Sequence, residues 1–368
     1  MMKKTVLLLI LILFVVGIYG CENNDKPNDE EPINQTYRNP VWAPVLADPA
    51  IIRHEGVYYA YGTQDYGQWG EDDFGVRYTP ILESKNLVDW TYAGSVFTMQ
   101  TRPIWGTPNA GLWAPDIVKI GDTFNLYYSL STWGDPNPGI GVATAPHPLG
   151  PWTDHGMVLR SLEVGVNNSI DPTVFVANDK VYMIWGSFRG IYGLELTANG
   201  LSLKDGGNAK NTKVLLAGLD TSFGWNAATY EAPYVIFKDG YYYMFLSSGT
   251  CCDGHNSTYN VRVARSVNPL GPYYGSDGRD MLATYRGHQV LQGSSQFFGP
   301  GHNAIAIDDA GQYWMVYHAF DAREAPNFGN SPRRSMLIDK LEWDALGWPT
   351  VNGLMPSNLE KEVPIINN

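Results

Sequence analysis

Three carboxylates, an imidazole and an indole occupy corresponding places in five segments of this sequence. Each segment carries an aromatic residue eleven positions after its leading residue, and the leading residues are Asp48, Trp113, Asp171, Glu231 and His302. Carboxyl groups that a fold brings close together cannot all ionise near neutral pH, so their pKa values separate. A carboxyl with a raised pKa can donate a proton while an ionised neighbour acts as base or nucleophile. This chemistry is typical of glycoside hydrolysis.

The sequence lacks the motifs of several other common classes of enzyme. The chain has no G-x-S-x-G segment, no P-loop, no HExxH helix and no dinucleotide-binding fingerprint. Aromatic residues are abundant, with 12 Trp, 23 Tyr and 13 Phe. Because the apolar C–H faces of sugar rings pack against Trp and Tyr, this composition favours a carbohydrate ligand.

The layout of the five segments predicts the fold that positions these side chains. Each segment reads as a strand, a turn containing Gly or Asp, and a second strand. The leading residues are 65, 58, 60 and 71 positions apart, which suits one four-stranded blade with its loops. Radial repetition of such sheets gives a propeller. We therefore predict an all-β, five-bladed β-propeller over residues 41–353, followed by a C-terminal tail over 354–368, with the leading residues around the central channel.

The charge balance excludes two classes of ligand. The 368 residues include 25 Lys and Arg against 37 Asp and Glu, a net charge of −12. Nucleic acids and anionic membrane surfaces attract clustered basic residues, which are absent from this sequence. We expect a monomer with no nucleic-acid partner.

The first twenty residues read as a secretory signal. Lys3 and Lys4 precede an apolar run over residues 6–20, which is too short to span a bilayer. Ile18-Tyr19-Gly20-Cys21 resembles a bacterial lipobox, which implies lipidation of Cys21; an ordinary signal peptide with a chance Cys is the alternative. The acidic residues up to 40 then form a tether. We expect a secreted protein that contacts the membrane only through its lipid, on the periplasmic face or the cell surface.

The two remaining cysteines are adjacent. The Cα atoms of Cys251 and Cys252 must lie about 3.8 Å apart, below the usual range for a disulfide. A strained disulfide and two free thiols both remain open. A thiolate metal site is disfavoured, because no other Cys is available to complete it.

The motifs around the leading residues resemble glycoside hydrolase family 43. They are Ala47-Asp48-Pro49, Trp113-Ala114-Pro115-Asp116, Asn168-Ser169-Ile170-Asp171-Pro172, Tyr230-Glu231-Ala232-Pro233 and Gly301-His302-Asn303. This family consists of five-bladed propellers that attack arabinan and xylan. Residues 251–259, 341–344 and 347–349 resemble the arabinanases within it. The resemblance implies hydrolysis of α-1,5-L-arabinofuranosidic bonds in arabinan, or action on an arabinoxylan-type polysaccharide.

The same resemblance implies a role for each carboxylate. Asp48 matches the general base that activates water, and Glu231 matches the general acid. Asp171 matches the third carboxylate, which tunes the pKa of the acid and holds its orientation. Family members invert the anomeric carbon, and the chemistry requires no cofactor.

The resemblance also assigns contacts outside the chemistry. Trp113 and Trp133 would form the sugar platform, and Asn168 and Ser187 would be polar contacts there. His302 matches a histidine near a hydrated calcium ion, although a lone imidazole prefers softer metals and waters would supply most ligands. Core or turn roles for the four contact residues, and a hydrogen-bonded histidine at 302, are the alternatives.

Two departures bear on the mode of attack. Ala47 stands where arabinanases carry His, and residues 64–77 form a long insertion whose Trp69 and Phe74 could close one end of the channel. We predict an endo-acting arabinanase. An exo-acting arabinofuranosidase or β-xylosidase is the alternative, and a non-catalytic glycan-binding propeller is a more remote one.

Overall fold

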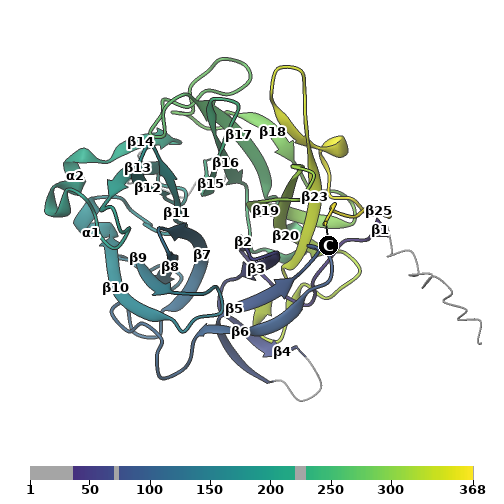
Figure 1. Cartoon of the computed structure of the whole chain (residues 1–368), viewed down its shortest axis with the longest axis horizontal. Helices are drawn as coiled ribbons and strands as arrows, with labels where there is room; N and C mark the ends of the chain where they lie inside the picture. The colour runs from purple at the N-terminus through teal and green to yellow at the C-terminus, as the bar shows by residue number, and fades with distance from the viewer. Residues whose placement is uncertain (1–35, 70–73, 220–228, 368) are drawn as a thin grey trace, which may run out of the picture. The chain divides into compact units, whose positions relative to one another are not determined.

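The computed structural model describes residues 36–69, 74–219 and 229–367, which form five antiparallel sheets around a central axis (Figure 1). Each sheet is one blade, and each blade is built from one continuous segment of the chain. The prediction of an all-β, five-bladed β-propeller is confirmed. The expected signal peptide and Cys21 lie outside the described residues.

The first two blades follow each other directly along the chain. Blade one contains β2 (Ala50–His54), β3 (Val57–Tyr61), β5 (Phe74–Ser84) and β6 (Thr91–Phe97), and β4 (Asp65–Gln68) pairs with the start of β5. Blade two contains β7 (Gly111–Ile120), β8 (Thr123–Ser131), β9 (Gly139–Ala145) and β10 (Thr153–Arg160).

The other three blades repeat this order. Blade three contains β11 (Thr173–Ala177), β12 (Lys180–Trp185), β13 (Ile191–Leu196) and β14 (Val214–Ala217). Blade four contains β15 (Glu231–Lys238), β16 (Tyr241–Ser248), β17 (Asn260–Ser266) and β18 (His288–Leu291). Blade five contains β19 (Phe297–Ile307), β20 (Tyr313–Asp321), β23 (Ser335–Trp343) and β24 (Pro349–Val351), and a small β21–β22 pair (Asn327–Phe328 and Ser331–Pro332) follows β20.

Helices are minor in this fold. The α-helices of the described chain, α1 (Ser161–Val164) and α2 (Ala209–Thr212), have four residues each, and three short 3₁₀ turns lie at Gly206–Asn208, Gly254–Asn256 and Asn352–Leu354. Within the described ranges, no helix is long and apolar enough to cross a membrane.

The hydrophobic core lies between the blades. Each of five apolar clusters draws its side chains from two neighbouring blades, so the clusters follow one another around the ring. The second strand of a blade is therefore buried on both faces, as β8 and β12 are, while the outer β10 is largely exposed. Packing between blades, rather than within one sheet, supplies most of the apolar burial.

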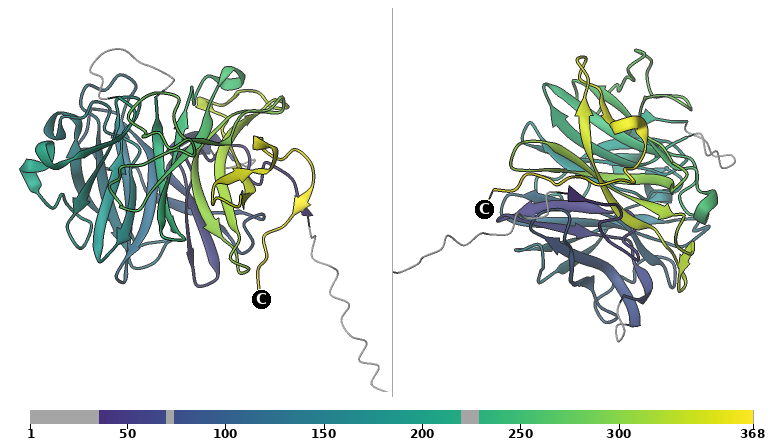
Figure 2. Two further views of the ribbon diagram at one scale, coloured as in Figure 1. Left: turned by 90° about the horizontal axis from the view of Figure 1, so that it is seen from above. Right: turned by 90° about the vertical axis from the view of Figure 1, so that its right-hand side faces the viewer.

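The ring is closed by the first described residues and the end of the chain. Thr36–Tyr37 (β1) pairs with Lys361–Glu362 (β25), and the figures show this pair on the outer side of blade five (Figure 2). Asn39 donates a hydrogen bond to the Ile338 carbonyl (2.9 Å) and accepts one from its N–H (3.0 Å). The folded unit thus runs from residue 36 through the tail, beyond the expected limits of 41 and 353.

Every blade has one residue in the left-handed region just before its first strand, as in blades one and three, or at an irregularity inside it, as in blades two, four and five. These residues are Asp48 (φ 55°), Ala114 (43°), Asp171 (57°), Ala232 (52°) and His302 (48°). In the first four blades the strand register counted from this residue is the same. The residue two positions after it pairs with the residue thirteen positions after it, as Ala50 pairs with Tyr61 after Asp48. Asp48 and Asp171 therefore correspond to Ala114 and Ala232. The predicted equivalence with Trp113 and Glu231 was wrong by one residue in blades two and four.

Candidate active site

All five predicted leading residues line one cavity despite this correction. The cavity has a volume of about 720 Å³ and also receives Thr63, Ser187, Tyr259 and Arg334. Asp48, Asp171 and Glu231 are each less than 8% exposed. The structure therefore brings together three buried carboxyl groups from blades one, three and four.

A ring of hydrogen bonds between blades places the left-handed residues. In every blade, the N–H of this residue donates to a side chain of the preceding blade, and in four of them the acceptor is a neutral group: Asp48 to His318 Nδ1 (3.0 Å), Ala114 to Thr63 Oγ1 (2.8 Å), Asp171 to Ser129 Oγ (2.9 Å) and His302 to Ser247 Oγ (2.8 Å). Each blade thus fixes the start of the next one.

The exception in this ring lies between blades three and four. The Ala232 N–H donates to Asp171 Oδ2 at 3.2 Å, and the Ser187 hydroxyl donates to Glu231 Oε2 at 2.6 Å. A carboxylate therefore replaces the neutral acceptor, and the freed hydroxyl holds the adjacent carboxylate. This change links Asp171 and Glu231 to one another through the backbone of residues 231–232.

Asp48 is held as an anion. Burial alone would raise its pKa, but the Arg334 guanidinium, with Nη1 2.7 Å from Oδ1, holds the pKa well below its usual range. His302, with Nδ1 3.3 Å from Oδ1, and the Thr63 hydroxyl, which donates to Oδ2 at 2.5 Å, act in the same direction. An ionised carboxylate with a spare lone pair can accept a proton from water.

Glu231 has the opposite character. Burial raises its pKa to about 8, and the negative charge of Asp48 adds to this, while the Ser187 hydrogen bond opposes it. Tyr259 donates to the other carboxylate oxygen, Oε1. The partners closest to Glu231 are thus neutral hydroxyl groups, so the carboxyl group retains its proton near neutral pH.

Asp171 shares this environment. Burial raises its pKa well above the usual value, and the charges of Glu231 and Asp48 raise it further. The Ala232 N–H and Arg334 act in the opposite direction. Because Asp171 and Glu231 interact, their protons belong to the pair rather than to either residue.

Two histidines lie beside Asp48, and of these His302 lines the cavity. His318 is completely buried, and its Nδ1 accepts the Asp48 N–H, so its proton lies on Nε2. Burial lowers the pKa of both His302 and His318, and the latter well below its usual value. The Tyr259 ring stacks on His318 with centroids 5.9 Å apart. Both imidazoles are therefore neutral groups that shape the surroundings of Asp48.

The donor set does not fit a calcium site built from protein ligands. Within the described residues, no three His, Cys, Asp or Glu side chains are placed to hold a metal ion. A protonated Nε2 removes His318 as a ligand, which leaves the single imidazole of His302.

The four residues predicted to contact the sugar all line the cavity, but they differ in exposure and in hydrogen bonding. Trp113 and Trp133 lie with ring centroids 5.6 Å apart, and Trp133 is 78% exposed at the rim of the cavity. Asn168 lines the cavity and donates to the Ser187 carbonyl at 3.2 Å. The Ser187 hydroxyl is committed to Glu231, so this residue positions a carboxyl group in addition to lining the cavity.

The blade-one insertion lines the cavity with residues other than the predicted Trp69. Trp69 packs against Trp42 and Tyr92, with centroids 5.3 Å from each ring, and the Arg77 guanidinium lies 4.3 Å from its ring. Trp69 therefore belongs to an aromatic cluster with Trp42 and Tyr92, whereas Gln64, Asp65 and Tyr66 line the cavity. Residues 70–73 lie outside the described ranges.

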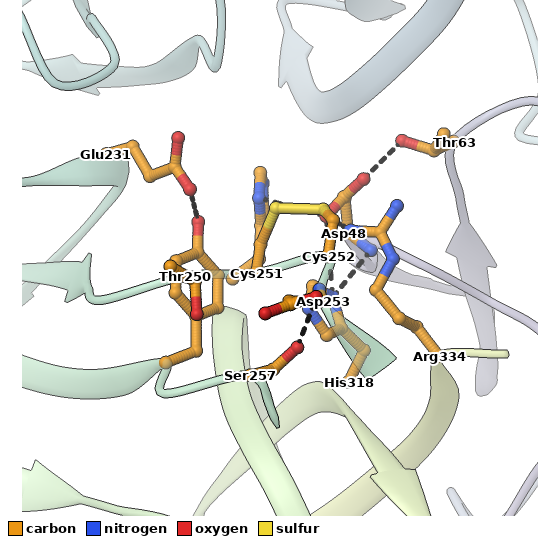
Figure 3. The surroundings of a disulfide bond; sticks show 12 residues. Asp48, Thr63, Glu231, Thr250, Cys251, Cys252, Asp253, Ser257, His318 and Arg334 are labelled. Carbon is orange, nitrogen blue, oxygen red and sulfur yellow. Dashed lines mark hydrogen bonds and ion pairs between the residues drawn. A yellow bond between two sulfur atoms is a disulfide. The ribbon is translucent and has the colours of Figure 1, made fainter. Parts of the chain in front are cut away.

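Cys251 and Cys252 form a disulfide, which resolves the alternatives left by the sequence. Both residues line the cavity, and Figure 3 shows the disulfide beside Glu231 and the Asp48–Arg334 pair.

Four residues of the site were missed by sequence reasoning. They are Thr63, Tyr259, His318 and Arg334. Arg334 follows the β21–β22 pair outside the repeating motif, so no spacing marked it. Thr63 could have been found, because it lies fifteen positions after Asp48, as Ser129 lies after Ala114 and Ser247 after Ala232.

Comparison with known proteins finds a family and a set of similar structures. Residues 37–349 match the model of glycosyl hydrolases family 43. An extracellular endo-α-(1→5)-L-arabinanase of Bacillus subtilis is 33% identical, covering 83% of this chain and 87% of the relative. An extracellular exo-α-(1→5)-L-arabinofuranosidase of Cellvibrio japonicus is 34% identical, covering 83% and 86%.

Solved structures show the same fold. The α-L-arabinanase of Cellvibrio cellulosa, in complex with arabinohexaose, has a TM-score of 0.70 and 29% identity, covering 85% of this chain and 99% of that chain. An endo-arabinanase of Bacillus licheniformis has a TM-score of 0.68 and 31% identity, covering 83% and 97%.

Proposed function

This chain belongs to glycosyl hydrolases family 43, and we propose that it hydrolyses α-1,5-L-arabinofuranosidic bonds in arabinan or arabino-oligosaccharides. Relatives named for this linkage match over 83% of the chain, and a neighbouring structure holds arabinohexaose. The observation that carries the proposal is the contrast between two buried carboxyl groups in one cavity. Arg334 keeps Asp48 ionised, while burial keeps Glu231 protonated.

In the proposed mechanism, Asp48 is the general base. Its carboxylate removes a proton from a water molecule, whose oxygen attacks the anomeric carbon. Glu231 donates its proton to the glycosidic oxygen as the bond to the leaving sugar breaks. Asp48 ends protonated and Glu231 ionised, and exchange with solvent restores both. A water placed between base and sugar leads to inversion at the anomeric carbon.

Asp171 acts on Glu231 rather than on the sugar in this proposal. The charge of Glu231 raises the pKa of Asp171, so the two carboxyl groups titrate together, and the contact of Asp171 with the Ala232 N–H holds the backbone that carries Glu231. Between the lowered pKa of Asp48 and the value of about 8 for Glu231, base and acid are in their working states at the same pH. Trp113 and Trp133 supply the apolar surface for a sugar ring.

Product analysis tests the substrate. The protein is incubated with linear 1,5-arabinan and, separately, with xylan, and the products are separated by chromatography. We expect arabinose or short arabino-oligosaccharides from arabinan, and a rate lowered at least ~100-fold in Glu231→Gln. Products from xylan alone would overturn the assignment. Tight binding of arabinan without cleavage would favour a glycan-binding propeller instead.

For the mode of attack, we propose endo cleavage. The arabinanase-like segment around Cys251 and Cys252 supports it, whereas Ala47 and the cavity-lining Gln64–Tyr66 segment favour the exo-acting alternative. Sequence identity does not distinguish endo from exo attack, since an endo-acting relative is 33% identical to this chain and an exo-acting relative is 34% identical. Endo attack lowers the viscosity of an arabinan solution quickly while few reducing ends form. Steady release of one short product at nearly constant viscosity would contradict it.

The protein is secreted, in agreement with its relatives named as extracellular. A lipid anchor on Cys21 is part of the proposal and rests on the lipobox-like sequence. Cys21→Ser should move the protein from the membrane fraction to the soluble fraction of the producing cells. An unchanged distribution would argue for an ordinary signal peptide.

A further inference from the structure

A disulfide between adjacent cysteines forms part of the cavity wall. Cys251 and Cys252 lie in the loop between β16 and β17 of blade four, and both side chains are partly exposed to the cavity. Figure 3 shows the disulfide among residues that line the same cavity, including Glu231, Asp48 and Arg334. The mechanism above assigns them no role.

The loop holds this disulfide in place through its own hydrogen bonds. The Thr250 carbonyl accepts hydrogen bonds from the N–H groups of both Thr258 and Tyr259 at 3.1 Å, and the Thr250 N–H donates to Thr258 Oγ1 at 3.0 Å. The Asp253 N–H donates to Ser257 Oγ at 2.9 Å. The backbone on both sides of the disulfide is thus anchored by hydrogen bonds within the loop.

The chemistry of this surface suits a sugar ring. A disulfide has no N–H or O–H group, and its sulfur atoms are large and polarizable, so it offers dispersion contacts to C–H groups. The aromatic pair Trp113 and Trp133 comes from blade two, and the disulfide comes from blade four, with blade three between them. The cavity therefore has apolar surfaces on two separate parts of its wall.

We propose that the Cys251–Cys252 disulfide is a sugar-binding surface that packs against the apolar face of an arabinofuranosyl unit. The proposal rests on the proposed function and extends it to a specific contact. Because the contact is the same in the bound substrate and in the transition state, its loss raises KM and leaves kcat nearly unchanged.

Steady-state kinetics on arabino-oligosaccharides tests the contact with the double variant Cys251→Ala/Cys252→Ala. We expect KM to rise about fivefold, the scale of a lost apolar contact of some tens of Å², with kcat within about twofold of the wild type. Asn256→Ala is the matched control, because Asn256 is an exposed residue of the same loop that does not line the cavity. It should leave both parameters unchanged.

A second measurement avoids mutation. Dithiothreitol reduces the disulfide of the wild-type protein to two thiols while the reagent is oxidised to its cyclic disulfide; KM should rise and should return after reoxidation. An unchanged KM in both experiments overturns the proposal. A fall in kcat at constant KM also overturns it, because the loop would then act through Tyr259 on Glu231. Failure of the proposed function is distinct, since the wild type itself would not cleave arabinan.

Discussion

At the residue scale, neighbouring groups rather than residue type set the roles of the carboxyl groups. Asp48 and Glu231 are both buried, yet Asp48 has a guanidinium 2.7 Å from its Oδ1 while Glu231 has the hydroxyl groups of Ser187 and Tyr259. A full positive charge offsets the cost of burying an anion, and two neutral donors do not. The pKa values therefore move in opposite directions within one cavity.

Arg334 should control the acidic limb of the pH–rate profile. Its charge lowers the pKa of Asp48, so Arg334→Gln should raise that pKa. The base then becomes protonated at higher pH, and activity should be lost earlier as the pH falls. Arg333→Gln is the control, because Arg333 pairs with Glu324 (3.2 Å) and not with Asp48. A profile with the same acidic limb in Arg334→Gln would show that this guanidinium does not set the base.

Asp171 should control the basic limb. The charge of Glu231 raises the pKa of Asp171, and repulsion between two carboxylates acts on both, so Asp171→Asn should lower the pKa at which Glu231 loses its proton. Activity should then decline at lower pH on the alkaline side, in addition to a lower maximum rate. The pH dependence of kcat in the variant measures this. If only the maximum changed, Asp171 would act by geometry and not by charge.

At the element scale, the start of each first strand is the unit that builds the site. The sequence repeats predicted the number of blades, their order and the five segments that line the cavity. The predicted register failed in blades two and four, because the aromatic residue used as reference does not pair with an equivalent residue in every blade. Tyr59 pairs with Ile52, four positions after Asp48, whereas Phe124 pairs with Lys119, six positions after Trp113. The constant feature is a residue with positive φ, which in four blades precedes Pro and in one precedes Asn303.

The residues that tune the carboxylates were not predictable in the same way. His318 and Tyr259 lie on or next to other strands, and Arg334 precedes β23. His318 and Arg334 of blade five reach Asp48 of blade one, and Tyr259 reaches Glu231 from another part of blade four, so these contacts depend on how strands and blades pack around the axis. A single sequence carries no spacing signal for such contacts.

Gly301 offers a test of how one strand positions the acid. It pairs with His318 in the β19–β20 ladder, and a Cβ atom there would lie 2.3 Å from Tyr259 Cδ2. Gly301→Ala should displace Tyr259 and lower kcat about tenfold or more through Glu231. Gly207→Ala, where a Cβ meets no atom within 4 Å, should have no effect. Wild-type kcat in Gly301→Ala would show that Tyr259 does not position the acid.

At the scale of the whole molecule, ring closure holds the five blades around one cavity. Asn39 is 4% exposed and joins the N-terminal segment to Ile338 in blade five and to Ser357 of the tail. The base Asp48 follows this segment directly, while Arg334 belongs to blade five. Closure therefore brings the base and its guanidinium partner together from the two ends of the folded chain.

Loss of this closure should reduce stability. Asn39→Ala removes several buried hydrogen bonds and should lower the free energy of unfolding by about 2–3 kcal/mol, measured by urea denaturation. Arg38→Ala removes an exposed pair with Glu360 and should cost less than about 1 kcal/mol. Equal stabilities in the two variants would show that Asn39 does not contribute to closure.

The most direct test of the proposed mechanism is the configuration of the first product. With Asp48 acting on water and Glu231 on the leaving oxygen, one displacement converts an α-linked arabinofuranosyl unit into the β-anomer. Proton NMR in the first minutes of arabino-oligosaccharide hydrolysis, before mutarotation, reports this directly. The account predicts that the β-anomer forms first and that the α-anomer grows in later. Initial formation of the α-anomer would contradict it, because Asp48 would then act as a nucleophile rather than as a base.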